Sequence, residues 1–455
     1  MTATSMMTTP KDSFDRFGDD LCQLLLTNLS IDDKLRLQSV SKQWLALIFN
    51  TETDLVFCRK LLDRMSLDSI RDYYQTIKLF QVIVRKCPNI TAVIISEVSL
   101  LDRFLDLLMI YCHRLRHICL KLDYDGHLSV IDRAFECFFR QFGQQLLTFK
   151  FNGYSIDYNK QLFYEVIDGM PNLKTLDITY EHRRSTVQLN DIIIGDMYYD
   201  LPKSLQSLNI KLDDSSVPLF ASFADIYGKQ LTSLTIVSVV DTDNMSYELI
   251  VNYQPLIDGL GQMVRLRRLK IVLFKYLLNN FTGDLFATIG RQCRQLKELS
   301  YLSIESNIVI IERMFAVINK HISGQHLKRL SLYCWPNYYQ EEEVMVVVDD
   351  EEEEEYLDLV LTCDLLNRLH GLTHLTLCFD RKFRIIGDQF FRNIHSNLPR
   401  LQYIHCDSVF STEESIIGTI INGQSSPSLS SKRLDVVVDH RCDANNLSKK
   451  TQIIY

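Results

Sequence analysis

The sequence predicts an α/β fold, a solenoid of tandem strand–helix units that follows a small module of three helices. Three observations predict it. One apolar motif recurs along most of the chain, stretches with helical periodicity lie between its copies, and the N-terminal segment follows a different pattern. A chain of 455 residues that is 46% hydrophobic and 23% charged can also bury a large core.

The recurring motif is a leucine or isoleucine followed by apolar residues three and five positions later. The last two alternate with variable residues, so they face the core from a short strand, and the first anchors the preceding turn. The eleven copies are Ile90-Val93-Ile95, Leu115-Ile118-Leu120, Leu146-Phe149-Phe151, Leu173-Leu176-Ile178, Leu205-Leu208-Ile210, Leu231-Leu234-Ile236, Leu266-Leu269-Ile271, Leu296-Leu299-Tyr301, Leu327-Leu330-Leu332, Leu372-Leu375-Leu377 and Leu401-Ile404-Cys406. A weaker copy, Ser431-Leu434-Val436, is expected to form a closing strand.

The spacing of the copies indicates the repeat type. Successive copies start 25 to 35 residues apart, except for one gap of 45 after Leu327. This spacing is typical of leucine-rich repeats with a helix in each unit, and helical periodicity is clear at residues 100–111, 130–142 and 310–322. One unit buries too little apolar surface to offset its ordering entropy, so the units must stack. We therefore predict a leucine-rich-repeat horseshoe over residues 86–440.

The cysteines fit this scheme. Twelve are scattered singly and none forms a Cys-x-x-Cys pair, so neither a disulfide framework nor a zinc module is expected. Cys87, Cys112 and Cys293 each lie three residues before the first apolar position of a copy, where other copies hold Gly, Pro, Met or Leu. Such a position serves packing at a helix-to-strand turn, and not catalysis or metal binding. We expect a reduced protein of the cytoplasm, the nucleus or both.

The charge is concentrated in one acidic insert. Residues 341–343 and 349–355 hold ten acidic side chains, and without them the formal net charge changes from −8 to +2. The insert is either a solvated, disordered loop or a screen over a basic surface, and in the second case its deletion raises affinity for acidic peptides. No uncharged apolar stretch reaches about 18 residues, and the N-terminus lacks a secretion signal, so no membrane association is expected.

The N-terminal module has its own pattern. Asp20 and Gln23 have the spacing of a capping box, and Ser30 with Asp33 indicates the start of a second helix. Three short helices make a thin core, so surplus apolar surface is expected to bind a partner. The apolar positions are Leu21, Leu24, Leu25 and Leu29 on one face of the first helix, followed by Leu35, Leu37, Val40, Trp44, Leu47 and Ile48.

The module resembles an F-box. The similarity runs from Phe17-Gly-Asp-Asp-Leu-Cys-Gln-Leu-Leu-Leu through Leu29-Ser-Ile-Asp-Asp-Lys to Val40-Ser-Lys-Gln-Trp44, with Phe17-Gly18 in place of the family's Leu-Pro and Ser41 in place of its Cys. The repeats are similar to the cysteine-containing leucine-rich repeats of many F-box proteins.

This resemblance implies that the box binds the small adaptor subunit of an SCF-type cullin–RING ubiquitin ligase, and that the repeats recruit the substrate. Several of the matching residues can alternatively fill the module's own core, above all Leu35 and Val40. The residues that would contact the adaptor, or support that contact, are Phe17, Gly18, Leu21, Leu25, Leu29, Leu35, Val40 and Trp44.

The variable strand positions indicate where a substrate binds. In a solenoid these positions point to solvent and usually form the recognition surface. The basic residues there are Arg116, Lys121, Lys150, Lys174, Lys211, Arg267, Arg268, Lys270, Lys297, Lys328 and Arg329, against only Asp177, Glu298 and Asp407. This excess suggests an acidic or phosphorylated protein partner, unless the basic side chains merely solvate the strands. Nucleic acid is less favoured, because interleaved aromatic residues are lacking.

We therefore predict a substrate-recognition adaptor, with a protein-binding scaffold free of ubiquitin function as the alternative. No enzyme motif or cofactor site is recognised. A metal site is not expected either, since His370 and His374 straddle a turn, as do His113 and His117. The predicted organisation is a disordered segment 1–11, the F-box 12–50, a helical linker 51–85, the repeats 86–440 with the insert at 338–355, and a tail 441–455.

Overall fold

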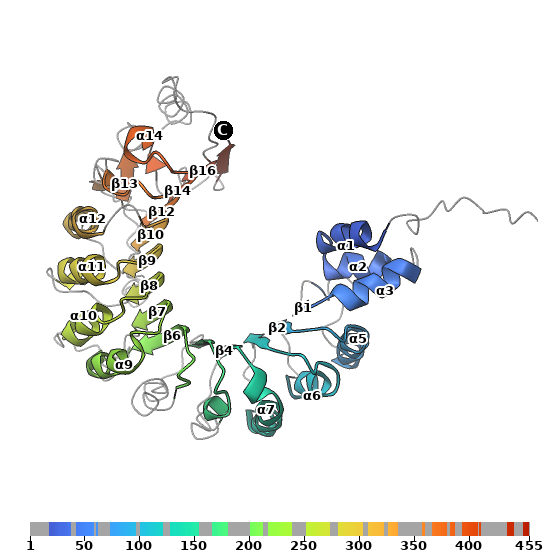
Figure 1. Cartoon of the computed structure of the whole chain (residues 1–455). Coiled ribbons are helices and arrows are strands. Elements are labelled where there is room, and N and C mark those ends of the chain that lie inside the picture. The colour runs from blue at the N-terminus through green and yellow to red at the C-terminus, as the bar shows by residue number, and fades with distance from the viewer. Residues whose placement is uncertain are drawn as a thin grey trace, which may run out of the picture. The chain divides into compact units, whose positions relative to one another are not determined.

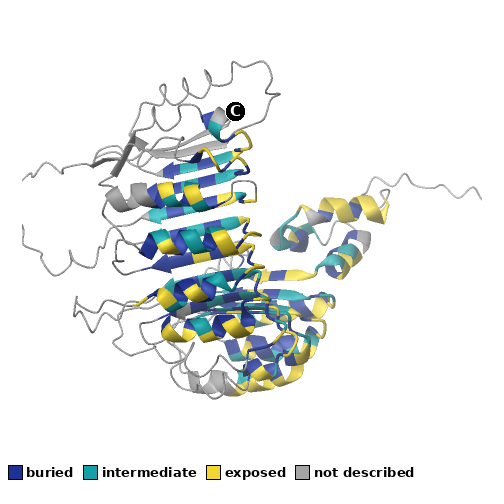
Figure 2. Ribbon diagram, turned by 60° about the vertical axis from the view of Figure 1, so that its left-hand side comes forward, coloured by how far each residue is buried: buried dark blue, intermediate teal, exposed yellow. Residues whose placement is uncertain are grey.

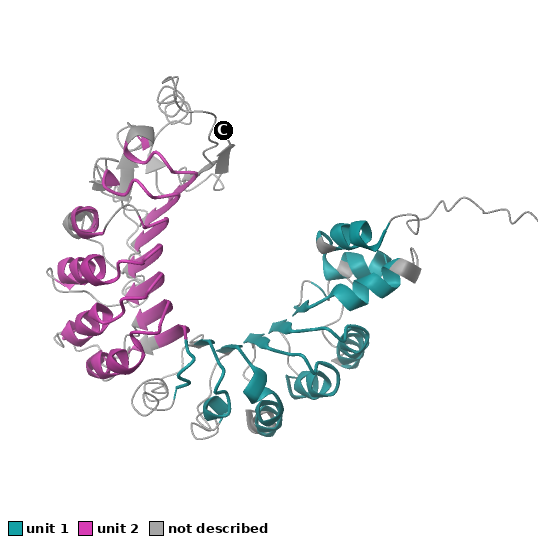
Figure 3. Ribbon diagram, viewed as in Figure 1, with its two compact units in different colours: residues 1–185, 200–205 teal, residues 186–199, 206–455 magenta. Residues whose placement is uncertain are grey.

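The chain divides into two compact units in the computed structural model (Figure 3). Unit 1 comprises residues 1–185 and 200–205, and unit 2 comprises residues 186–199 and 206–455. The structure describes residues 18–37, 42–58, 61, 73–96, 101–121, 128–153, 166–180, 201–212, 217–238, 252–273, 281–303, 308–322, 326–334, 357–359, 366–379, 383–386, 394–407, 409–410, 435–440 and 449–454.

Unit 1 joins a three-helix module to parallel strands in sequential order. Figure 1 shows the helices that follow the module on one side of these strands. The module is α1 (Asp19–Thr27), α2 (Ile31–Leu37) and α3 (Lys42–Thr51). The strands are β1 (Asp54–Phe57), β2 (Ala92–Ser96), β3 (His117–Lys121), β4 (Thr148–Gly153) and β5 (Thr175–Tyr180), with α5 (Tyr73–Lys86), α6 (Leu101–Tyr111), α7 (Leu128–Phe142) and η2 (Gly143–Gln145) between them.

Unit 2 continues the strand–helix alternation with its own parallel strands. These are β6 (Ser207–Leu212), β7 (Ser233–Ser238), β8 (Arg268–Leu273), β9 (Glu298–Ser303), β10 (Arg329–Cys334), β12 (His374–Phe379), β14 (Tyr403–Asp407) and β16 (Asp435–His440). The helices are η5 (Val217–Leu219), α9 (Phe220–Tyr227), α10 (Gln254–Gly261), α11 (Phe281–Gln292), α12 (Ile308–His321) and α14 (Ile394–Asn397).

One hydrogen-bond pattern repeats at the start of nearly every described strand. The N–H groups of Arg116 and His117 both donate to the carbonyl of Thr91, at 2.8 and 2.9 Å. Because the acceptor is the matching residue of the preceding repeat, this pair fixes the register between neighbours. The carbonyls that accept such a pair are those of Thr53, Thr91, Arg116, Leu147, Gln206, Thr232, Arg267, Lys297, Lys328 and Thr373.

The predicted motif forms the core. All three apolar positions of all eleven copies are buried, for example Leu115, Ile118 and Leu120 at 1% exposure or less. Figure 2 shows buried residues in dark blue alternating with less buried ones along the strands. Helix residues such as Phe104 and Phe286, both fully buried, cover them from the helical side. The sequence prediction of a mixed α/β repeat array is therefore confirmed at the level of its strands and helices.

The cysteines at the helix-to-strand turns are buried as predicted. Cys87 and Cys112 are fully buried and Cys293 is 3% exposed. The carbonyl of each accepts the N–H of the first apolar residue three positions later, as Cys112 does from Leu115 at 3.1 Å. Burial raises the pKa of all three thiols to about 12.

The helix starts of the module were predicted with mixed success. The prediction of a capping box at Asp20 and Gln23 is wrong. Helix α1 begins at Asp19, and its N-cap is Gly18, which makes no side-chain cap bond. Asp19 and Asp20 instead place two carboxylates in the first turn, where the helix dipole favours them. The Ser30 start is confirmed, since the Asp33 N–H donates to the Ser30 hydroxyl at 3.4 Å.

The repeats begin earlier than predicted. Residues 54–57, expected in a helical linker, form β1, which pairs in parallel with β2. Leu55 and Phe57 occupy the fourth and sixth motif positions and are buried at 1% and 0% exposure. Glu52 stands at the first position, where a leucine is usual, so the apolar motif does not predict this unit.

The C-terminal part also differs from the prediction. The closing strand exists as β16, but Ile404 pairs with Val436 and Cys406 with Val438, two residues later than the predicted motif. Within the predicted tail, β17 (Lys449–Ile454) pairs with β16 in the antiparallel direction. A second, three-stranded parallel sheet of β11 (Leu357–Leu359), β13 (Phe383–Ile386) and β15 (Val409–Phe410) was not predicted.

Candidate protein-interaction surfaces

Helix α1 carries an exposed apolar ridge. Leu21, Leu24 and Leu25 are 44%, 61% and 40% exposed, whereas Cys22 and Leu26 on the other side of the helix are 0% and 1% exposed. Residues at i, i+3 and i+4 are neighbours on a helix surface, so the three leucines form one patch. We call this patch the α1 ridge. Exposed apolar residues that gather in one patch are typical of a binding surface.

The interior of the module lies beneath the ridge. Leu35 and Trp44 are 8% and 4% exposed, like the fully buried Ile48, so they fill the core, which is the alternative that the sequence left open. Gly18 is exposed and Leu29 is half-buried. Phe17 and Val40, two more predicted adaptor-binding residues, lie outside the described residues.

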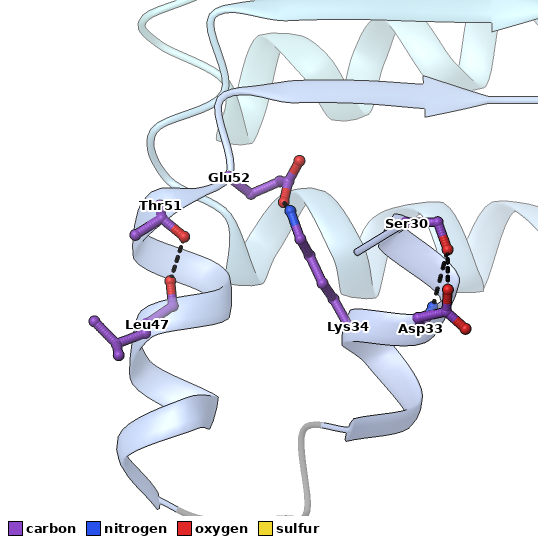
Figure 4. A network of polar contacts seen from close by, with 6 residues as sticks. All are labelled: Ser30, Asp33, Lys34, Leu47, Thr51 and Glu52. Atoms are coloured by element: carbon purple, nitrogen blue, oxygen red, sulfur yellow. Dashed lines mark hydrogen bonds and ion pairs between the residues drawn. The ribbon is translucent and has the colours of Figure 1, made fainter. Parts of the chain in front are cut away.

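A buried ion pair ties the module to the first strand. Lys34 Nζ of α2 lies 2.5 Å from Glu52 Oε2, and the two side chains are only 11% and 12% exposed (Figure 4). The Ser30 hydroxyl donates to Asp33 at 2.6 Å, and the Thr51 hydroxyl donates to the carbonyl of Leu47 at 2.7 Å. Removing one partner of a buried pair leaves an uncompensated charge, so the pair favours one position of α2 against the α3–β1 junction.

In unit 1 the predicted basic residues are exposed but dispersed. Arg116, Lys121, Lys150 and Lys174 are distributed over β3, β4 and the turns before β3 and β5. Lys150 Nζ lies 3.8 Å from Asp177 Oδ2 of the neighbouring strand, so part of its charge is compensated.

In unit 2 the structure brings most of the predicted basic residues together on β8 and β10 and in the turns that precede β8, β9 and β10. We call this group the cationic strip. Lys328 is half-buried, and the other members of the strip are exposed. Lys211, which is not part of the strip, has a side chain outside the described residues. The acidic neighbour Glu298 is paired by register with Arg268 and Arg329, and its Oε1 lies 3.9 Å from Arg329 Nη1. The strip consists of Arg267, Arg268, Lys270, Lys297, Lys328 and Arg329.

Hydroxyl groups follow the strip on the same face of the sheet. Ser300, Ser331 and Thr376 occupy the fifth motif position of β9, β10 and β12 and are paired by register, with Lys270 beside Ser300. We call these three residues the hydroxyl row. The sequence reasoning missed them because it counted charges alone, although their even spacing within the motif was visible.

His374 occupies the third motif position of β12 and is the register partner of Arg329 on β10. Its Nδ1 lies 2.9 Å from the Thr373 hydroxyl, and its ring centroid lies 5.8 Å from that of Tyr403. Burial lowers the pKa of His374 from its ordinary value, and the nearby Arg329 guanidinium lowers it further, while Glu298 opposes this shift.

An apolar row occupies the seventh motif position of the same strands. It consists of Val272, Leu302, Tyr333 and Cys378, which are paired by register from β8 to β12. Leu302 and Tyr333 are half-buried, and Val272 and Cys378 are 6% and 5% exposed. Along the strand direction, the side chains on this face therefore change from basic to hydroxyl-bearing to apolar.

Comparisons with protein-family models and with curated proteins give no match. Among solved structures, the chain is similar to a crystal structure of a Bacteroides fragilis protein from a structural genomics consortium. The TM-score is 0.26 and the identity 14%, over 77% of this chain and 69% of that chain. A similarity at this level carries no argument about function.

The described part of the chain holds neither a metal cluster nor a membrane span. No group of three or more His, Cys, Asp or Glu side chains there is arranged to hold a metal ion. No helix in that part is both long and apolar enough to cross a membrane.

Proposed function

We propose that this protein is a substrate-recognition adaptor of an SCF-type cullin–RING ubiquitin ligase, with no catalytic activity of its own. In this proposal the N-terminal module is an F-box that binds the adaptor subunit of the ligase. The strand–helix units are leucine-rich repeats whose exposed sheet face binds the protein to be ubiquitinated.

The observation that carries the proposal is the α1 ridge. A helix of nine residues exposes Leu21, Leu24 and Leu25 while Cys22 and Leu26 already supply its packing against the module. Full burial of one such side chain contributes about 1.5–3 kcal/mol, so a partner that covers the ridge gains a useful binding energy. Two of the three ridge residues, Leu21 and Leu25, are among those that the F-box resemblance assigns to adaptor binding, and a repeat array follows the module.

The test is capture of the ligase adaptor subunit by the full-length protein. We expect wild type to capture it, and Leu24→Asp and Leu25→Asp each to reduce capture at least about tenfold, because an aspartate at a buried interface must be desolvated. Ile110→Asp is the matched control, since Ile110 on α6 is 56% exposed and lies outside the module. Its capture should equal that of wild type.

The alternative function is a protein-binding scaffold without a role in ubiquitination. It becomes the better account if folded wild-type protein never captures the adaptor subunit, or if Ile110→Asp weakens capture as much as the ridge variants do.

A further inference from the structure

The sheet face of unit 1 carries an exposed apolar patch on the strands that follow the three-helix module. Val56 of β1 and Ile94 of β2 are 46% and 36% exposed, and Cys119 of β3 is half-buried. The three residues are register partners, and neighbouring strands lie about 4.8 Å apart, so the three side chains form one row. Half-buried Ala92, two residues before Ile94, lies on the same face of the sheet. We call these four residues the β1–β3 patch.

The apolar character of this place is confined to the first three strands. Val56, Ile94 and Cys119 occupy the fifth motif position, where the copies from β4 to β14 all have polar residues. Core packing does not require the row, because Leu55 and Phe57 bury the opposite face of β1 at 1% and 0% exposure. Single exposed apolar residues are ordinary, but adjacent ones are typical of a binding surface. The polar residues of the later copies are Lys150, Asp177, Asn209, Thr235, Lys270, Ser300, Ser331, Thr376 and His405.

Charged residues border the patch on two sides. Lys121 follows Cys119 by two residues on β3, and Lys150 of β4 is the register partner of Cys119; both lysines are exposed. Asp177 compensates only part of the charge of Lys150, because an exposed pair at 3.8 Å contributes little. Asp54, exposed on β1, lies at the opposite border. A bound segment therefore gains from a carboxylate over β3 and β4, but not over β1.

The spacing of these groups fits an extended protein segment that crosses the strands. Ile94 and Lys150 lie two strands apart, which corresponds to about 9.6 Å. In an extended segment, side chains two residues apart point to the same side about 6.6 Å from each other. The flexible four-carbon stem of a lysine spans the difference. An aliphatic side chain on the patch thus brings an acidic side chain two residues away within reach of Lys150.

The size of the patch favours such a segment over a second copy of this chain. A stable interface between two folded proteins takes about 20–30 residues from each side, whereas the patch consists of four. One aliphatic side chain is enough to cover most of it. Nucleic acid has no aliphatic side chain to place there.

We propose that the β1–β3 patch binds an aliphatic side chain of the recruited protein, and that Lys121 and Lys150 pair with an acidic side chain two residues away in the same segment. This inference rests on the proposed function, because it names the kind of segment that the adaptor recruits. It assigns this recognition to the strands that follow the ligase-binding module directly in the chain, and not to the cationic strip of unit 2.

The probe is a library of peptides with one fixed leucine and flanking residues drawn at random from the polar amino acids, offered to the full-length protein. A matched library carries serine at the fixed position. We expect retention of the leucine library at least about fivefold above the serine library, because the patch removes apolar surface of the leucine from water. Acidic residues should be enriched two positions from the leucine at about 0.01 M salt but not at about 1 M, whereas the leucine preference should persist at both.

Substitutions at Ile94 locate the apolar part of the site. Ile94→Asp should abolish the leucine preference, because the aliphatic side chain would have to desolvate a carboxylate. Ile94→Thr keeps a β-branched residue in the strand and should weaken the preference with the fold intact, as circular dichroism verifies. Ile110→Asp is the matched control, since Ile110 is 56% exposed on α6, and it should behave as wild type.

Charge reversal tests the basic border separately. Lys121→Glu should remove the enrichment of acidic residues while it leaves the leucine preference in place. Lys174→Glu is the control, because Lys174 is exposed in the turn before β5 and lies away from the patch. It should leave both the enrichment and the preference unchanged.

Several outcomes overturn the inference. These are equal retention of the two libraries, a leucine preference that survives Ile94→Asp, and a preference that Leu302→Asp in unit 2 abolishes instead. Self-association of the wild-type protein that Ile94→Asp abolishes, measured by sedimentation velocity, would assign the patch to a second copy. The same preparations are assayed for capture of the ligase adaptor subunit. Capture without a leucine preference rejects this inference alone, and a leucine preference without capture rejects the ligase function alone.

Discussion

At the scale of single residues, the turn cysteines show how the repeat uses small side chains. Cys87, Cys112 and Cys293 lie where a helix turns into a strand, and each carbonyl accepts the N–H of the first apolar residue of the motif. Burial first, and for Cys112 also the neighbouring Cys87, raises the pKa of these thiols to about 12. A thiol rather than a thiolate is therefore the form present at neutral pH, and these positions have a structural role.

This environment predicts the pattern of alkylation. At about pH 8 a thiol with a pKa of about 12 is ionised in only about one molecule in ten thousand, and iodoacetamide reacts with the thiolate. We expect Cys87 and Cys293 to remain unmodified in the native protein while Cys137, exposed on α7, is alkylated. Peptide mass spectrometry measures each site, with denatured protein as the control in which all three react. Equal rates at Cys293 and Cys137 in the native protein would contradict the burial of Cys293.

Single residues also set the limit of the sequence analysis. The apolar motif predicts the strands that have an apolar first position but not β1, where Glu52 takes that place. The structure gives the reason: Lys34 compensates the carboxylate at 2.5 Å in a nearly buried setting. A partner 18 positions away in the sequence is not visible to a search for local periodicity. The sequence placed Leu21, Leu24 and Leu25 on one face of the helix, but which face packs against the module was not predictable, since Cys22 and Leu26 are apolar as well.

At the scale of elements, helices of successive repeats approach each other through glycine. An added Cβ at Gly290 of α11 would lie 2.0 Å from the carbonyl oxygen of His321, the last residue of α12. An added Cβ at Gly283, in the first turn of the same helix, would meet no atom within 4 Å. The two glycines thus form a matched pair on one helix.

The pair predicts opposite effects of the same substitution. Gly290→Ala must displace backbone and should lower the free energy of unfolding by about 1–3 kcal/mol. Gly283→Ala should raise it by up to about 1 kcal/mol, because alanine has the higher helix propensity and there is space for its methyl group. Denaturant titration of the full-length protein, followed by circular dichroism, measures both. A Gly290→Ala protein as stable as wild type would show that α12 does not lie this close to α11.

The elements with a repeated pattern were the predictable ones. Helices α6, α7 and α12 lie within two residues of the ranges expected from helical periodicity. The three-stranded sheet of β11, β13 and β15 was missed, because its strands have two to four residues and lie outside the motif. For the cationic strip, the sequence indicated the basic residues, and the structure adds that β8, β9 and β10 are neighbours, so that these strands and the turns before them bring six basic residues together.

At the scale of the whole molecule, the charge balance depends on one segment. Residues 341–343 and 349–355 carry ten negative charges in a protein whose formal net charge is −8. These residues lie outside the described part of the chain. They follow β10, whose Arg329 belongs to the cationic strip. We expect their field to oppose the approach of an acidic or phosphorylated ligand to that strip.

We predict that removal of this charge raises the affinity for acidic peptides, and that the gain depends on the salt concentration. For a variant without residues 341–355, we expect a short peptide of alternating glutamate and serine to bind several-fold more tightly than to wild type at about 0.01 M salt, where the screening length is about 30 Å. The gain should vanish at about 1 M salt, where that length is about 3 Å. Fluorescence anisotropy measures both. A second variant with glutamine or asparagine at the ten acidic positions separates charge from chain removal, since it should reproduce the gain with the insert at full length. If only the deletion binds more tightly, charge repulsion is not the cause, and steric exclusion by the insert becomes the explanation to examine.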